Sequence, residues 1–93
     1  MSENGVAVRR VRVRNRLGLH ARPAAELVKL ASRFDAGITL EKGGLEVNGK
    51  SIMGVLMLAA EQGSEVTIRG EGTDAAEAVD VLSAFVDRGF EED

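Results

Sequence analysis

The chain has 93 residues, a net charge of -3 and an apolar fraction of 44%, which fits one domain with one modest hydrophobic core. It contains no cysteine and one histidine, so a disulfide framework and a zinc–thiolate site are excluded, and we expect neither a metal nor a cofactor. The longest apolar run, residues 52–60, is far shorter than the roughly 20 residues of a membrane-spanning helix. Because the N-terminus also lacks an apolar signal core, we expect a soluble cytoplasmic protein with no membrane insertion.

The first third of the chain predicts a strand, a loop and a helix. Residues 11–14 alternate apolar and polar side chains, as a half-buried strand does, and residues 15–18 are typical of a loop. Val6 and Val8 fall on the opposite parity, which predicts a bulge there or a later start of the strand. Apolar residues then recur at helical spacing from Ala24 to Phe34, with Pro23 in the first turn, where a missing N–H costs little.

The middle of the chain predicts a hairpin followed by a short helix. Residues 38–41 and 45–47 alternate on either side of a Lys-Gly-Gly turn. Ser51 is a favourable N-cap for a helix that we expect to run from Ile52 to about Ala60.

The last third predicts a strand over residues 66–69 and a final helix. Asp74 followed by Glu77 resembles a capping box, and Gly89 is expected to end the helix. All three predicted helices have one apolar face, so they should cover one side of a mainly antiparallel four-stranded sheet. We therefore predict an α+β open-faced sandwich of order βαββαβα, with residues 1–93 forming a single domain and residues 1–7 a possibly flexible extension.

The segment around His20 carries the chemistry. Gly18 permits a tight turn, and His20 falls at the N-cap of the predicted helix, where Ser, Thr, Asp or Asn would be the stabilising choice. A helix N-terminus offers unpaired amide groups and a positive partial charge, and Arg22 adds a guanidinium suited to phosphate. Pro23 fixes the backbone beside them. An imidazole nucleophile, a cation and a helix dipole together favour a site that holds a phosphoryl group on the ring.

Charge is unevenly distributed along the chain. The first quarter is rich in arginine and the C-terminal residues 91–93 are acidic. A basic cluster indicates either a solvated strand face or a surface for an acidic partner, and both interpretations stay open. The arginines concerned are Arg9, Arg10, Arg12, Arg14, Arg16 and Arg22.

Two other functions are disfavoured by the sequence. Residues 44–51 match a P-loop pattern, but residues 45–47 form a strand inside the supposed loop, and Glu46 would repel phosphates. The element order also suits an RNA-recognition domain, yet the three phenylalanines all lie outside the predicted strands, where such domains stack bases. We therefore expect neither nucleotide hydrolysis nor nucleic-acid binding.

The segment 15–24, Asn-Arg-Leu-Gly-Leu-His-Ala-Arg-Pro-Ala, resembles the active-site signature of HPr, the histidine-containing phosphocarrier family of the bacterial sugar phosphotransferase system. The segment 50–55, Lys-Ser-Ile-Met-Gly-Val, resembles the regulatory serine segment of that family. The resemblance covers residues 8–89 and implies the fold predicted above.

The resemblance also implies a function. His20 would accept a phosphoryl group on Nδ1 from Enzyme I and donate it to IIA domains, and Arg22 would stabilise the phosphohistidine. The protein would be a monomeric carrier without independent turnover. Gly18, Ala21 and Pro23 would complete the phosphate-binding loop.

Ser51 would be phosphorylated by an HPr kinase/phosphorylase, beside a docking surface. An adaptable methionine surface suits a carrier with several partners. The alternative is a regulatory docking protein of the same fold, controlled through Ser51 and with little role in sugar transport. The predicted docking residues are Leu19, Ala25, Ile52, Met53, Leu56 and Met57.

Overall fold

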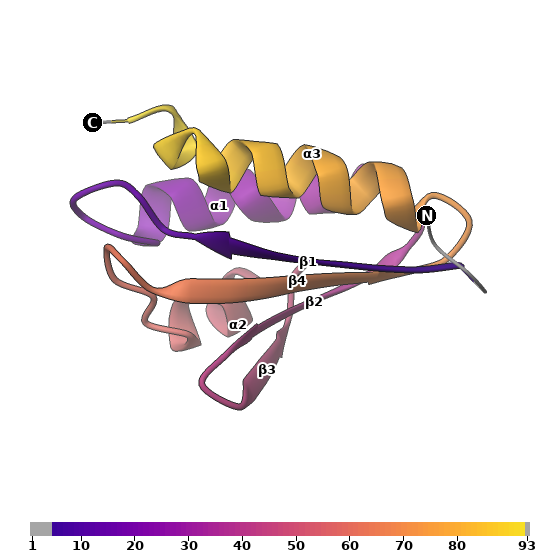
Figure 1. The fold of residues 1–93 in the computed structure, drawn as a ribbon, viewed down its shortest axis with the longest axis horizontal. Helices are drawn as coiled ribbons and strands as arrows, with labels where there is room; N and C mark the ends of the chain where they lie inside the picture. The colour runs from indigo at the N-terminus through magenta and orange to yellow at the C-terminus, as the bar shows by residue number, and fades with distance from the viewer. Residues whose placement is uncertain (1–4, 93) are drawn as a thin grey trace.

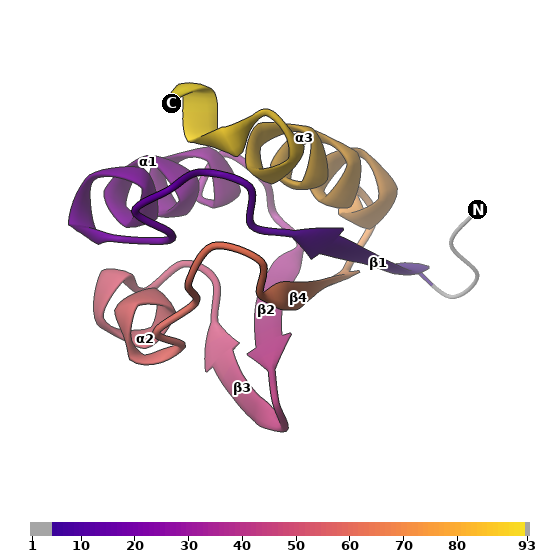
Figure 2. The same cartoon turned by 60° about the vertical axis from the view of Figure 1, so that its left-hand side comes forward.

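The computed structural model describes residues 5–92 and forms an open-faced sandwich, with one antiparallel sheet of strand order β1-β4-β2-β3 and three helices packed on one side of it (Figures 1 and 2). This confirms the predicted fold class. The elements, in chain order, are β1 (Val6–Arg12), α1 (Ala21–Ala31), β2 (Gly37–Lys42), β3 (Leu45–Asn48), α2 (Ile52–Met57), β4 (Glu65–Glu71), α3 (Ala75–Asp87) and a 3-10 turn (Gly89–Glu91).

Strand β1 forms an unbroken ladder with β4. The register runs without a bulge from Val6 opposite Glu71 to Arg12 opposite Glu65. The expected bulge or later start is therefore wrong, and residues 6 and 7, which we assigned to an N-terminal extension, belong to the strand. Because side chains alternate along a strand, Val8, 57% exposed, faces away from the helices, whereas Ala7 packs against the core.

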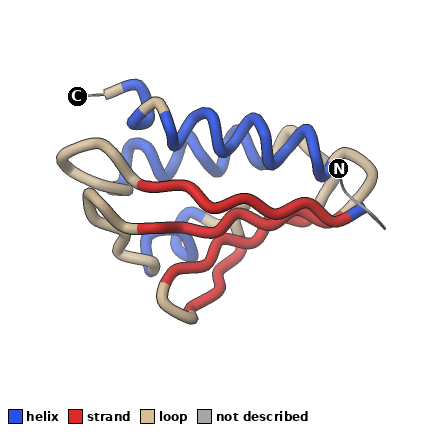
Figure 3. Tube along the Cα trace, in the orientation of Figure 1, coloured by secondary structure: helices blue, strands red, loops and turns tan. Residues whose placement is uncertain are grey.

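Figure 3 distinguishes the strands of the sheet from the helices that cover it. The buried core residues come from both and lie between them. Leu40 and Ile68 supply its centre from adjacent strands, and Leu27 and Leu82 cover them from α1 and α3. Each such side chain stabilises the fold by about 1.5–3 kcal/mol when fully buried.

Two helices are shorter than the sequence predicts. Helix α1 ends at Ala31, and α2 ends at Met57, because Ala59 adopts a left-handed backbone with a φ of 49° that a helix cannot contain. Helix α3 ends before Gly89, whose φ of 67° turns the chain, as expected for a glycine after a helix.

Asp74 does not form the predicted capping box. It precedes α3, but its carboxylate accepts hydrogen bonds from the backbone amides of Asp35 (2.9 Å) and Ala36 (2.8 Å) instead of the first turn of its own helix. These bonds lower the pKa of Asp74 and fasten the turn between α1 and β2 to the start of α3.

Within residues 5–92, the helices are all too short or too polar to cross a lipid bilayer.

Candidate functional site

His20 is the N-cap of α1. It has extended backbone angles (φ -82°, ψ -173°), its carbonyl accepts the first helical hydrogen bond from Ala24, and its side chain makes no capping bond to the helix. The ring is therefore available for other interactions at the positive end of the helix. About a third of the His20 side chain (34%) is exposed to solvent.

The loop before His20 is anchored to the segment that follows α2. Gly18 has a φ of 71°, and a Cβ at this position would lie 2.5 Å from the carbonyl oxygen of Ala60. Leu19 donates its backbone amide to that same oxygen at 2.9 Å. The prediction that Leu19 belongs to a docking surface is wrong, because its side chain is 6% exposed and lies in the core, which holds the loop in place.

Asn15 supports this loop from below the surface. Its side chain is 2% exposed, and its Nδ2 donates to the carbonyl of Gly18 at 2.7 Å and to a carboxylate oxygen of Glu92 at 2.6 Å. Its Oδ1 is buried without a hydrogen-bond partner among the described residues. Asn15 stood within the family signature, but its contact with the far end of the chain was not foreseen.

Glu92 completes the site and was missed by the sequence analysis. Its two carboxylate oxygens lie 2.9 and 3.2 Å from Nε2 of His20, and the same carboxylate forms an ion pair with Arg22. The hydrogen bond from His20, with those from Asn15 and Arg22, lowers the pKa of Glu92 to about 2 against the opposing effect of desolvation. The sequence showed an acidic C-terminus and a turn at Gly89, but nothing that placed residue 92 beside residue 20.

Arg22 lies in the first turn of α1 and is half exposed. Besides Glu92 it pairs with Glu26, at 3.3 Å across one helical turn, and its pKa is raised chiefly by the hydrogen bond to Glu92. Ala21 is exposed and Pro23 is buried, so the first turn of α1 is open to solvent on the side of His20 and Arg22 and packed on the other.

Ser51 is the N-cap of α2. Its Oγ accepts a 3.1 Å hydrogen bond from the amide of Gly54, in the arrangement that a capping serine normally adopts. Figure 2 shows α2 and the loop before α1 at the same end of the molecule, so Ser51 and His20 belong to elements that share one end of the fold.

Exposed apolar side chains accompany Ser51. Ile52, Met53 and Met57 are 44%, 72% and 64% exposed, whereas Leu56 is half-buried against the core. Ala25, on α1, is also half-buried. Leu17, in the loop before His20, is 65% exposed and was not among the predicted docking residues.

Besides Arg22, three of the six arginines near the N-terminus are engaged within the fold. Arg9 pairs with Asp80 at 2.6 Å and Arg14 with Asp87 at 3.0 Å, and both contacts join the first quarter of the chain to α3. Arg12 donates to the carbonyl of Gly63 at 2.7 Å. For these residues the structure favours a solvated face that stabilises the fold.

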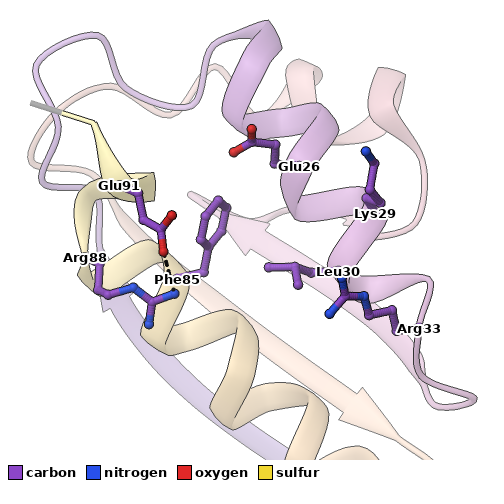
Figure 4. Close-up of a pocket in the computed structure, with 7 residues that line it drawn as sticks. All are labelled: Glu26, Lys29, Leu30, Arg33, Phe85, Arg88 and Glu91. Carbon is purple, nitrogen blue, oxygen red and sulfur yellow. Dashed lines mark ion pairs between the residues drawn. The ribbon is translucent and has the colours of Figure 1, made fainter.

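A shallow pocket lies between α1 and α3 and does not include His20. Figure 4 shows Leu30 and Phe85 forming its apolar floor, with charged side chains from α1 and from the segments that follow α1 and α3 around it. Among residues 5–92, no group of three or more histidine, aspartate or glutamate side chains is placed to hold a metal ion.

The fold and the site together define a class: a small α+β domain that presents one accessible imidazole beside a guanidinium at a helix N-terminus, as expected of a histidine phosphocarrier. Comparison with known proteins assigns the family. Residues 7–88 match the family model described as the PTS HPr component phosphorylation site. The chain belongs to the HPr family of phosphocarriers of the phosphotransferase system.

The relatives include proteins named as phosphocarriers and an HPr-like protein named Crh. The chain is 44% identical to phosphocarrier protein NPr of Proteus mirabilis, over 91% of this chain and 96% of that protein. It is 49% identical to the HPr-like protein Crh of Bacillus subtilis, over 83% of this chain and 91% of that one. The crystal structure of phosphocarrier protein HPr from Bacillus anthracis superposes with a TM-score of 0.85 and 51% identity, over 89% of this chain and 99% of that one.

Proposed function

We propose that His20 accepts a phosphoryl group on Nδ1 from Enzyme I and donates it to sugar-specific IIA domains. The observation that carries the proposal is the position of a partly exposed imidazole at the N-terminus of α1, next to Arg22. A neutral imidazole is a competent nucleophile for phosphorus. The amides of the first helical turn and the guanidinium then stabilise the transferred dianion.

The protein acts as a carrier without independent turnover. A phosphoryl group held at the start of a helix on a rigid scaffold is accessible to two partners in succession. Phosphoryl transfer requires in-line geometry and charge stabilisation, and each partner supplies part of both.

Ser51 regulates this carrier through phosphorylation by an HPr kinase/phosphorylase. A phosphate at the N-cap of α2 is compatible with the helix dipole, so the fold survives the modification. The new negative charge lies beside the exposed Ile52 and Met53, where it weakens apolar docking of Enzyme I.

A second candidate function is a regulatory docking protein that acts through Ser51 and transports little sugar. The likeness to an HPr-like protein with a separate name, Crh, favours it. The presence of His20 favours the carrier, because a regulator that had lost phosphoryl transfer would not need this imidazole.

The experiment is a two-step transfer assay. The protein is incubated with phosphoenolpyruvate and Enzyme I, re-isolated, and then mixed with a IIA domain. We expect wild type to gain an acid-labile phosphate and to pass it on, and His20→Ala to gain none. Ser51→Asp should fold normally and accept the phosphoryl group more slowly. Labelling of His20→Ala at the wild-type rate would contradict the proposal.

A further inference from the structure

We propose that Glu92 is a positioning residue for His20, whose carboxylate keeps the ring proton on Nε2 and so leaves Nδ1 free to accept the phosphoryl group. The inference rests on the proposed function for its consequence, but the geometry concerns the free protein. Glu92 lies beyond the region that the family model matches, residues 7–88.

The contact between Glu92 and His20 determines which ring nitrogen of His20 is the hydrogen-bond donor. Both oxygens of the Glu92 carboxylate lie within hydrogen-bond distance of the same ring atom, 2.9 and 3.2 Å from Nε2 of His20. An ionised carboxylate can only accept, so Nε2 must carry the hydrogen. A neutral imidazole has one such hydrogen, and therefore Nδ1 presents a lone pair.

The carboxylate is held in its ionised form. Its side chain is 17% exposed, Asn15 donates to one oxygen at 2.6 Å, and Arg22 pairs with the other. The pKa of Glu92, near 2, leaves no protonated carboxyl at neutral pH. A second carboxylate-bearing residue in this segment, Glu91, pairs with Arg88 instead, at 3.3 Å (Figure 4).

The segment that carries Glu92 has a defined conformation and packs against the rest of the fold. After α3 the chain turns at Gly89, and both Phe90 (φ 56°) and Glu91 (φ 60°) adopt left-handed backbones that non-glycine residues rarely take. Such conformations persist where surrounding contacts determine them. Here the Phe90 ring is fully buried and packs edge-on against Phe85, with ring centroids 5.4 Å apart.

The same contact assists the transfer step. The Nδ1 lone pair forms the bond to phosphorus while the bond between phosphorus and the phosphorylated atom of Enzyme I breaks, and that electron pair stays with Enzyme I. The His20 ring keeps its Nε2 proton and becomes positively charged. The Glu92 carboxylate neutralises this charge, as a carboxylate does for the imidazolium of a catalytic triad. Donation to the next acceptor reverses the step.

The test uses the full chain and its matched variants. Long-range ¹H–¹⁵N NMR of the imidazole reports which ring nitrogen carries the proton, without any partner protein. We compare wild type with Glu92→Gln, which removes the charge at nearly constant size, with Glu92→Ala, and with the control Glu91→Ala. Backbone spectra verify that each variant is folded.

We expect the Nε2–H tautomer alone in wild type and in the control, and a detectable Nδ1–H population in both Glu92 variants. Phosphorylation by Enzyme I should slow about tenfold in the Glu92 variants, which lose one charge-assisted hydrogen bond to the reacting ring, and stay unchanged in the control. An unaltered tautomer in the Glu92 variants would overturn the inference. Equal or faster transfer would also overturn it, because the carboxylate would then be a competitor of the phosphoryl group. Failure of wild type to accept phosphate would refute the proposed function while leaving the tautomer result intact.

Discussion

The backbone amide of Leu19 donates a 2.9 Å hydrogen bond to the carbonyl oxygen of Ala60. This contact helps to join the loop that precedes His20 to the segment that follows α2, and it depends on a close approach of backbone to backbone. Gly18 makes that approach possible, because a Cβ at this position would lie 2.5 Å from the same oxygen. The position of the imidazole thus depends on a glycine two residues earlier.

Gly18→Ala should destabilise the fold by about 2–4 kcal/mol, because the substitution adds a steric clash to an unfavourable left-handed backbone. Gly43→Ala is the matched control. Gly43 also has a positive φ, 58°, but a Cβ there meets nothing within 4 Å, so only the backbone cost of about 1 kcal/mol remains. Urea unfolding measures both, and equal losses in the two variants would show that the contact with Ala60 is unimportant.

Ser51→Ala should cost about 1 kcal/mol of unfolding free energy, since the amide of Gly54 loses its acceptor. Ser51→Thr retains a hydroxyl and should recover most of the loss. The measurement is the denaturant midpoint of each variant at constant slope. An unchanged unfolding free energy in Ser51→Ala would mean that the hydroxyl does not cap α2.

The Glu92 carboxyl should titrate near pH 2 in the folded protein, compared with an ordinary value of 4.5. Because the pKa is lower in the folded state, ionised Glu92 stabilises the fold above about pH 4.5, and this contribution is lost as the pH falls towards 2. The side-chain ¹³C shift of Glu92 measures the midpoint directly.

His20→Ala is the matching variant for this titration, because the hydrogen bond from His20 is the largest cause of the lowered pKa. The Glu92 midpoint should rise towards its ordinary value when the imidazole is removed. A midpoint near 4.5 in wild type would show that the carboxylate does not contact the ring in solution.

Met57→Glu should reduce the rate of phosphorylation by Enzyme I several-fold and change the stability by no more than about 0.5 kcal/mol, because the side chain is 64% exposed. Val8→Glu is the control: Val8 is 57% exposed, but on the open face of the sheet. The rate is measured at limiting carrier concentration. If both variants accept the phosphoryl group equally fast, the exposed surface around Met57 is not used for docking.

The strand and helix order was predictable because hydrophobic periodicity along each element is a local property. The ends of the helices were less predictable from the sequence. Nothing in the residues of α2 signals its end at Met57, which results from the left-handed backbone of Ala59, where the chain turns towards the histidine loop. The capping box at Asp74 failed for a related reason, since its carboxylate is used by a loop that lies 38 residues away in the sequence.

The residues of the candidate site also differ in whether the sequence could predict their positions. His20, Arg22 and Gly18 lie within five residues of each other, so sequence spacing alone could place them together. Glu92 is 72 residues from His20 and comes to it through a turn after α3, a contact that no local pattern encodes. Leu19 was misplaced because loop residues show no periodicity that separates a buried side chain from an exposed one.

The role of His20 as the carrier residue is tested by locating the phosphoryl group on the modified protein. After labelling with phosphoenolpyruvate and Enzyme I, ³¹P–¹⁵N NMR of the isolated protein identifies the atom bonded to phosphorus. We expect one phosphoryl group on Nδ1 of His20. Phosphate found on Nε2, or on another residue with His20 unmodified, would contradict it.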